Sequence, residues 1–276
     1  MIDDIDSPAV EASDVSIRYG RGSGGHLAVS GATFSIARGE ILAVIGETGS
    51  GKSTLAAAVA GFAGLGIPTS PEITGGVLTV LGEQMRTLTP RSRDRLLISV
   101  GYLPQDAGAA LSPRLTIGEN VAEPIFSRDR RFDAREAGEA VATLIDAVRL
   151  PLAVMGRYPH ELSRGQRQRV AIAKALILGP TVLVADDPTA GIDVTVRGAI
   201  LDIIRDLQRD QNFSALIVSH TISEVRKYSD RVAVMHRGAI VGIGQVDDVL
   251  DSPQHEYVGG LARAVRDLKL SEQLSA

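Results

Sequence analysis

The chain has 276 residues, a formal net charge of −4 and no cysteine. It can bury a substantial core, its acidic balance argues against a nucleic-acid partner, and a disulfide framework or thiolate metal site is excluded. The most apolar run, residues 55–67, is broken by Gly61, Gly64 and Gly66 and falls short of the roughly 20 residues of a membrane span. The acidic beginning, MIDDIDSPAV, does not resemble a signal peptide. We therefore expect a cytosolic protein that would reach a membrane only by docking onto other subunits.

The first hundred residues predict strands of two kinds. Residues 15–19 and 32–36 alternate apolar and polar side chains, as in an antiparallel sheet, and a glycine-rich hairpin region separates them. Residues 73–80 predict another strand after a turn rich in proline and glycine. Residues 41–45 are instead continuously apolar, which suits a strand buried on both faces of a parallel sheet.

The rest of the chain alternates strands with helices, and the lack of an evident internal repeat indicates a single module. Residues 182–185 and 215–218 are further apolar runs of strand length, with helical spacing between them. From residue 106 to 163 helical patterning dominates, which predicts a helical insert in an α/β core. One face of this insert carries Val141, Leu144, Ile145 and Val148.

The loop after residues 41–45 fits the pattern G-x-x-x-x-G-K-[ST] and opens an apolar helix, residues 54–60. This context is that of a P-loop, in which glycines let backbone N–H groups curl around phosphates at a helix N-terminus. Lys52 would reach the β- and γ-phosphates and the Ser53 hydroxyl would ligate Mg²⁺; a glycine-rich turn formed by coincidence is the disfavoured alternative. The predicted nucleotide-binding residues here are Gly46, Glu47, Thr48, Gly49, Ser50, Gly51, Lys52, Ser53 and Thr54.

Two acids, Asp186 and Asp187, end the apolar strand at residues 182–185. Such a strand suggests a metal–phosphate site, with Asp186 holding Mg²⁺ through water, although solvated strand-end acids are the simpler alternative. A P-loop does not by itself choose among kinase, GTPase and ATPase. No convincing N-K-x-D motif for reading guanine is present.

A rarer motif, residues 162–169 (LSRGQRQR), opens a helix upstream of the two acids. Together these segments resemble the signature motif and Walker B strand of ABC-type ATPases, and the likeness covers residues 10–261. It implies an α/β P-loop NTPase with a RecA-like core and parallel sheet, an antiparallel β subdomain and a helical ABC-specific subdomain. The implied divisions are a single domain, 10–261, with core and β subdomain at 10–105 and 164–250, a helical subdomain at 106–163, and a tail at 262–276.

The resemblance also implies roles for residues outside the P-loop. Tyr19 stands where ABC proteins place an aromatic that stacks on adenine, although a plain strand aromatic is the alternative. Gln105 matches the Q-loop, which contacts Mg²⁺ or water and couples to the membrane partner. Asp193 is the acid of the D-loop, His220 would contact the γ-phosphate, and Asp187 would polarise the attacking water. The implied catalytic residues are Asp187, His220 and Gln105, and the implied metal ligands are Ser53, Gln105 and Asp186.

The signature motif implies how the protein assembles. Ser163, Gly165 and Gln166, at a helix N-terminus, offer donors suited to a γ-phosphate. In ABC proteins two such domains pack head to tail, so the P-loop of one faces the signature of the other. The resemblance thus implies ATP bound between two ATPase subunits.

Several segments are similar to the dipeptide, oligopeptide and nickel importer ATPases: residues 102–106, 158–163, 193–196, 230–235 and 252–257. This implies a peripheral protein on the cytoplasmic face of the membrane, with ATP and Mg²⁺ as cofactors. The implied partners are a second ABC ATPase, two transmembrane permease subunits and, indirectly, an extracellular solute-binding protein. The alternatives are a nickel or metallophore importer ATPase and a soluble ABC ATPase of a cytosolic assembly complex.

Two positions depart from the family pattern. Asp187 stands where glutamate is usual, which would draw the carboxylate back and predicts slow hydrolysis at this chain's own P-loop. Arg164 stands where glycine is common, and a solvated arginine and a contact with the partner's nucleotide are equally open. Because the two departures touch different composite sites, we expect a heterodimer with unequal sites.

Overall fold

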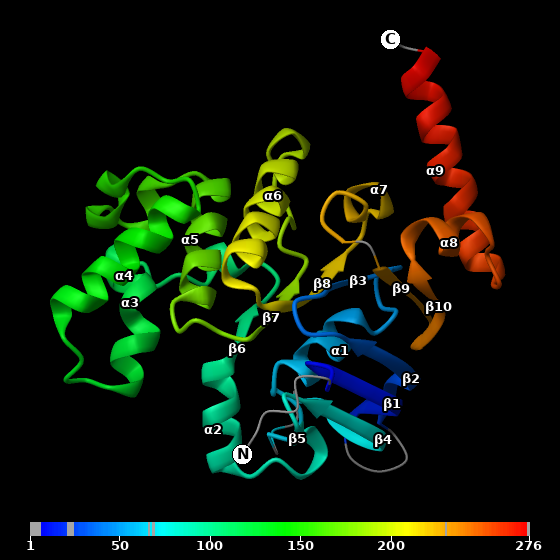
Figure 1. Ribbon diagram of the computed structural model, residues 1–276, viewed down its shortest axis with the longest axis horizontal. Helices are drawn as coiled ribbons and strands as arrows, with labels where there is room; N and C mark the ends of the chain where they lie inside the picture. The colour runs from blue at the N-terminus through cyan, green and yellow to red at the C-terminus, as the bar shows by residue number, and fades with distance from the viewer. Residues whose placement is uncertain (1–6, 21–24, 66, 68–69, 230, 275–276) are drawn as a thin grey trace.

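The computed structural model describes residues 7–20, 25–65, 67, 70–229 and 231–274 (Figure 1). Their N-terminal part forms an antiparallel sheet with the strand order β2-β1-β4-β5. Its strands are β1 (Val10–Tyr19), β2 (His26–Ile36), β4 (Glu72–Val80) and β5 (Glu83–Gln84). The strands expected at residues 15–19, 32–36 and 73–80 all lie in this sheet.

A second sheet has the order β10-β9-β3-β8-β7-β6. All neighbouring strands from β9 to β6 are parallel, and β10 is antiparallel to β9. These strands are β3 (Ile41–Gly46), β6 (Val100–Leu103), β7 (Val182–Asp186), β8 (Ser214–Ser219), β9 (Arg231–His236) and β10 (Ala239–Gln245). The predicted α/β fold, with a parallel sheet beside an antiparallel one, is therefore confirmed.

Helices connect and cover the sheets (Figure 1). The α-helices are α1 (Lys52–Val59), α2 (Pro90–Ser99), α3 (Ile117–Arg128), α4 (Ala134–Ala147), α5 (Arg164–Leu176), α6 (Val194–Gln211), α7 (Ile222–Val225), α8 (Val246–Asp251) and α9 (Glu256–Leu274). Short 3₁₀ helices are η1 (Met85–Thr87), η2 (Ala107–Ala109), η3 (Leu152–Gly156) and η4 (Pro159–Glu161). Within the described ranges, no helix combines the length and apolar character needed to cross a membrane.

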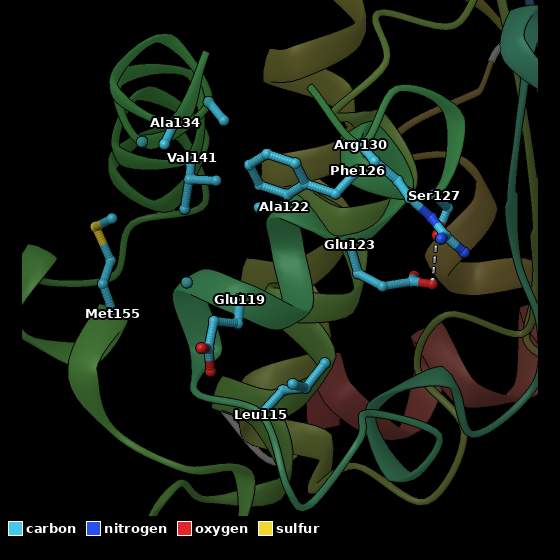
Figure 2. Close-up of a pocket in the computed structure, with 13 residues that line it drawn as sticks. Leu115, Glu119, Ala122, Glu123, Phe126, Ser127, Arg130, Ala134, Val141 and Met155 are labelled. Carbon is cyan, nitrogen blue, oxygen red and sulfur yellow. Dashed lines mark hydrogen bonds between the residues drawn. The ribbon is translucent and has the colours of Figure 1, made fainter. Parts of the chain in front are cut away.

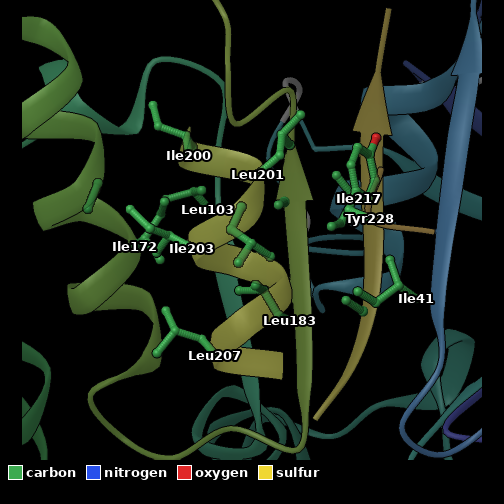
Figure 3. Close-up of a cluster of buried hydrophobic side chains, with 14 of the residues drawn as sticks. Ile41, Leu103, Ile172, Leu183, Ile200, Leu201, Ile203, Leu207, Ile217 and Tyr228 are labelled. Carbon is green, nitrogen blue, oxygen red and sulfur yellow. The ribbon is translucent and has the colours of Figure 1, made fainter. Parts of the chain in front are cut away.

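The central strand β3 separates two hydrophobic clusters. Its residues Ile41, Ala43 and Ile45 join a cluster with α6 and the helical insert, part of which Figure 3 shows. Leu42 and Val44 point the other way, into a cluster shared with α1 and the antiparallel sheet. Because both faces of β3 are covered, its sequence is apolar at every position instead of alternating.

The region between β6 and β7 is helical, as expected. The predicted apolar face of α4 is confirmed, since Val141, Leu144 and Ile145 are buried, and Val148 is buried just beyond the helix end. Helices α3 and α4 pack against each other and against α5, and α5 also contacts β6 and α6. The helix that carries the signature motif thus joins the helical insert to the sheet.

Asn120, on α3, binds the backbone of residues 112–116, the segment that precedes α3. Its side chain is fully buried; Oδ1 accepts a hydrogen bond from the Ser112 N–H at 2.8 Å. Its amide donates to the carbonyls of Ser112, Leu115 and Thr116 at 2.9 to 3.0 Å. Buried backbone groups must find partners, so one side chain here fixes a whole turn.

We predict that Asn120→Ala lowers the free energy of unfolding of the full chain by about 3 kcal/mol, since it leaves buried backbone groups unpaired. Urea unfolding followed by circular dichroism would measure the change. Thr143→Ala is the matched control, because it also removes a side-chain bond to a carbonyl, that of Glu139, but at an exposed position. We expect a loss of at most about 0.5 kcal/mol there; equal losses in the two variants would contradict the assignment.

Candidate nucleotide-binding site

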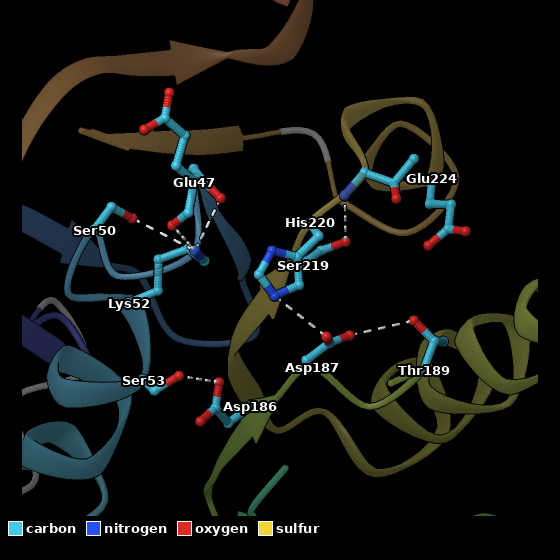
Figure 4. A network of polar contacts seen from close by, with 12 residues as sticks. Glu47, Ser50, Lys52, Ser53, Asp186, Asp187, Thr189, Ser219, His220 and Glu224 are labelled. Carbon is cyan, nitrogen blue, oxygen red and sulfur yellow. Dashed lines mark hydrogen bonds and ion pairs between the residues drawn. The ribbon is translucent and has the colours of Figure 1, made fainter. Parts of the chain in front are cut away.

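Three parallel strands end at one edge of the large sheet and bring the predicted motifs together (Figure 4). Strand β3 runs into the P-loop, β7 ends at Asp186, and β8 leads to His220. The register pairs Ile45 with Ser219, and Asp186 with Val218. Ligands of open α/β sheets bind at this carboxyl edge of the strands.

The backbone of the loop comes so close to neighbouring strands that two glycines are required. Gly51, the residue before α1, has φ +100°, and an added Cβ would lie 2.2 Å from the Ala28 carbonyl oxygen. At Gly46, with φ +152°, a Cβ would lie 2.0 Å from the Met235 carbonyl oxygen. Helix α1 begins directly after Gly51, at Lys52, two residues earlier than the start predicted at residue 54.

Lys52 lies under the loop, only 4% exposed. Its amine donates to the carbonyls of Gly46 and Glu47 at 2.8 and 2.7 Å, and lies 3.4 Å from the Ser50 hydroxyl. Burial lowers the pKa of Lys52, and the charges of Asp186, Asp187 and Glu47 oppose that shift. The site thus holds a desolvated cation at the N-terminus of a helix, an arrangement suited to phosphate oxygens.

Two of the three residues predicted to hold Mg²⁺, Ser53 and Asp186, are in contact. The Ser53 hydroxyl donates to Oδ1 of Asp186 at 3.0 Å. Burial raises the pKa of Asp186, and the neighbouring charge of Asp187 adds to this, whereas the Ser53 bond and Lys52 lower it. Hydroxyl and carboxylate oxygens are ligands that Mg²⁺ prefers, so these two side chains fit the ion and would hold it. Bound there, Mg²⁺ would offset the negative charge of phosphate oxygens.

Asp187 and His220 also meet at this edge (Figure 4). Oδ2 of Asp187 is 3.4 Å from Nε2 of His220, and Oδ1 is 3.5 Å from the Thr189 hydroxyl. Asp187 is 9% exposed and its backbone adopts a left-handed conformation, φ +50°, which aspartate tolerates better than most residues. A carboxylate and an imidazole therefore face each other next to the loop.

Other predicted residues lie around this centre. The Thr54 hydroxyl donates to the Tyr19 hydroxyl at 3.4 Å, which brings the aromatic beside the start of α1. Gln105 is exposed on the turn after β6, whose Leu103 pairs with Ala185 just before the two acids. Glu47, Thr48 and Gly49 are exposed on the loop and Ser50 is buried beneath it.

The signature residues lie away from the loop, because α5 packs with α6 in the cluster on one face of the large sheet, whereas α1 packs in the cluster on the other face (Figure 1). Ser163 caps α5: its N–H donates to the Gln166 side chain at 2.9 Å, and the Gln166 N–H donates to the Ser163 hydroxyl at 3.3 Å. Gly165 follows in the first turn. Asp193 caps α6 and accepts from the Thr195 N–H and hydroxyl, contacts that lower its pKa.

The sequence reasoning missed a group of aromatic rings beside the P-loop. His236 stacks on Tyr257, with ring centroids 4.4 Å apart, and its Nδ1 lies 3.9 Å from a carboxylate oxygen of Glu47. The position of His236 at the end of a strand was a usable signal, because a strand parallel to β3 and next to it must end near the P-loop. In the structure Met235 pairs with Gly46. These contacts join the beginning of α9 to the loop.

An apolar cavity of about 700 Å³ lies elsewhere, between α3, α4 and η3 (Figure 2). Ala122, Phe126, Val141 and Met155 line it together with the polar Glu119 and Glu123. None of the predicted site residues is among those that line it within the described part of the chain. It is therefore separate from the phosphate site.

The geometry and the comparisons with known proteins agree on the class. Residues 29–190 match the family model described as ABC transporter. The chain is 39% identical over 246 residues to the glutathione import ATP-binding protein GsiA of Escherichia coli O6:H1, a match that covers 89% of this chain and 38% of GsiA. It is 36% identical over 238 residues to the oligopeptide transport ATP-binding protein OppF of Escherichia coli K12, covering 86% and 69%. The chain belongs to the ABC transporter ATP-binding family.

Solved structures share the fold. The structure of cbiO1 from Clostridium perfringens, described as part of the transporter complex cbiONQ, has a TM-score of 0.76 and 26% identity, covering 90% of this chain and 92% of that one. The dimeric ATP-binding cassette MJ0796 bound to ADP and phosphate has a TM-score of 0.75 and 24% identity, covering 86% and 98%. The chain spans 38% of the length of GsiA.

We predict that Asp186→Asn stabilises the nucleotide-free protein by about 1 kcal/mol at neutral pH, because it removes a poorly solvated charge. With the folded pKa raised, the native state binds more protons than the unfolded state, so the charge of Asp186 lowers stability as pH rises. The gain over the wild type should therefore vanish below the ordinary aspartate pKa and grow as pH rises through the raised one. Thermal unfolding at a series of pH values would measure it.

Asp193→Asn is the control with opposite sign, because contacts lower the pKa of Asp193 in the folded protein. This carboxylate adds stability above its ordinary pKa, and the benefit is lost as pH falls through the lowered one. Asp193→Asn should therefore not stabilise the protein at neutral pH. A stabilisation of both variants alike would show that burial of Asp186 is not the cause.

Proposed function

We propose that this chain is the ATP-binding and ATP-hydrolysing subunit of an importer for peptides or a related small solute. The observation that carries the proposal is the contact of the P-loop Ser53 with Asp186, next to the Asp187–His220 pair. Such a site offers a buried cation for phosphates and a carboxylate for a water molecule. The import functions in the names of GsiA and OppF support the solute class.

Each side chain has a role in this proposal. Lys52 and the loop N–H groups bind the β- and γ-phosphates, while Tyr19 stacks on adenine. Ser53 and Asp186 hold Mg²⁺, with Gln105 as a further ligand to the ion or its water. Asp187 accepts a proton from the attacking water, and His220, 3.4 Å from Asp187, orients that carboxylate and contacts the γ-phosphate.

The signature residues imply a second subunit. Ser163, Gly165 and Gln166 lie at the start of α5, which packs on the opposite face of the large sheet from α1, the helix that follows the P-loop. They therefore serve the ATP bound to a partner cassette, and the partner's signature serves this one, while Asp193 lies at the contact between the two. The dimeric form of MJ0796 supports this arrangement. The partner is a homologous ATPase, and both dock onto two permease subunits at the cytoplasmic face of the membrane, with a solute-binding protein outside.

Two measurements test this function. The full chain should bind ATP with Mg²⁺ in calorimetry, and Lys52→Ala should weaken binding at least about tenfold, since it removes the buried cation beneath the loop. The tagged chain should co-purify from native membranes with two polytopic subunits. Recovery in a complex without membrane subunits would instead favour a cytosolic assembly ATPase.

We predict that Asp187→Glu raises the turnover of the assembled transporter by about 10- to 100-fold, because a displacement of about 1 Å can cost that much in rate. Steady-state phosphate release at saturating ATP would measure it. Asp187→Asn, which keeps the size but loses the base, should lower turnover by at least about tenfold. If the glutamate variant is no faster than the wild type, the short side chain is not what limits hydrolysis.

A further inference from the structure

Arg164 is paired within its own chain. Nη2 of Arg164 lies 2.6 Å from Oδ1 of Asp106, the residue that follows Gln105, and both side chains are about half-exposed. The two are 58 positions apart in sequence. The departure from glycine in the signature motif thus creates a contact between the start of α5 and the turn after β6.

The same guanidinium also covers the segment that follows Asp187. Gly191 has φ +62°, and a methyl group added there would lie 2.1 Å from Nη2 of Arg164 and 2.2 Å from its Cζ. The guanidinium therefore lies against the Gly191 backbone. One side chain touches both neighbouring loops of the site and belongs to the signature motif itself.

Gln168, one helical turn after Arg164 on α5, makes a second contact with the segment that follows Gln105. The Gly108 N–H, in η2, donates to Oε1 of Gln168 at 3.1 Å, and Gln168 is 5% exposed. Residues four apart lie on the same face of a helix, so Arg164 and Gln168 hold the same short segment. The Gln168 contact is buried and neutral, whereas the Arg164 contact is charged and can open to solvent.

Electrostatics favour this pairing over a free arginine. Arg164 is the first residue of α5, where a cation is opposed by the helix dipole, and the first turn of α5 contains no acid. Asp106 supplies a negative charge at this position from another segment. For Arg164 to reach a partner's phosphate, it would first have to leave this partner.

We propose that Arg164 is a positioning residue that fastens the segment after Gln105, and Gly191, to the start of the signature helix. A movement of Gln105 is then transmitted to Ser163 and Gln166, and through them to the ATP of the partner subunit. This consequence rests on the proposed function, whereas the fastening itself concerns the single chain.

Hydrogen exchange of the full chain without nucleotide tests the fastening. Arg164→Ala and Asp106→Asn should each speed exchange of the Gly108 amide by about two- to fivefold, as expected from loss of a half-exposed ion pair. The double variant should be no faster than either single one, since both remove the same contact. Arg164→Lys should retain part of the protection, because it keeps the charge but not the planar group over Gly191.

Asp206→Asn is a matched control. It breaks the Arg149–Asp206 pair, which has the same 2.6 Å length and similar exposure, but should leave Gly108 exchange unchanged. Unchanged exchange in Arg164→Ala, or additive effects in the double variant, would overturn the fastening. Because this experiment needs neither nucleotide nor partner, its result is independent of whether Lys52→Ala abolishes ATP binding.

Kinetics of the assembled transporter test the consequence. Arg164→Ala and Asp106→Asn should lower kcat to a similar extent, about two- to fivefold, and leave KM for ATP within about twofold. If Arg164 were instead a ligand of the partner's nucleotide, Arg164→Ala alone would raise KM, while Asp106→Asn would free the guanidinium and would not. That split would overturn the proposal.

Discussion

The parallel alignment of β3, β7 and β8 is the constraint on which the site depends. Because the three strands share a direction and register, they end together and deliver Lys52, Asp186 and His220 to one edge. None of these residues is near the others in sequence. The continuous apolar character of the strands, buried on both sides, is what holds that alignment, so the hydrophobic core and the polar edge are parts of one arrangement.

The carboxyl edge of the large sheet brings together charged side chains whose burial lowers the stability of the fold. Lys52 and Asp186 are both poorly solvated, and their pKa values move towards the neutral forms. Proteins accept such a cost where a ligand with complementary charge is to be bound. The contact between Asp187 and His220 uses a left-handed backbone to place a short carboxylate. The site is thus suited to a ligand with complementary charges, as in the nucleotide and Mg²⁺ of the function proposed above.

Local pattern was enough to predict the parts of the site that lie within one segment. The P-loop, the acids after β7 and the antiparallel strands follow from spacing and periodicity, which are local properties. The Arg164–Asp106 pair could not be predicted in this way, because it depends on how the turn after β6 sits on α5. The place of His236 beside the P-loop could not be predicted for the same reason, because its neighbour Glu47 belongs to another strand end. The helical subdomain at residues 106–163 remains a prediction. Its C-terminal boundary falls just before α5, and α5 contacts both α3 in that subdomain and β6 in the large sheet.

The close approach of Gly51 to Ala28 and of Gly46 to Met235 has a consequence for affinity. Strands β2 and β9 pack against the P-loop and fix its curvature. The Gly238 N–H, just beyond β9, also donates to the Ser50 carbonyl at 3.1 Å. A loop whose curvature is set by its own neighbours loses little conformational entropy when an anion arrives. In the function proposed above, the binding energy of the phosphates is then left for another purpose, which is to hold the two proposed ATPase subunits together.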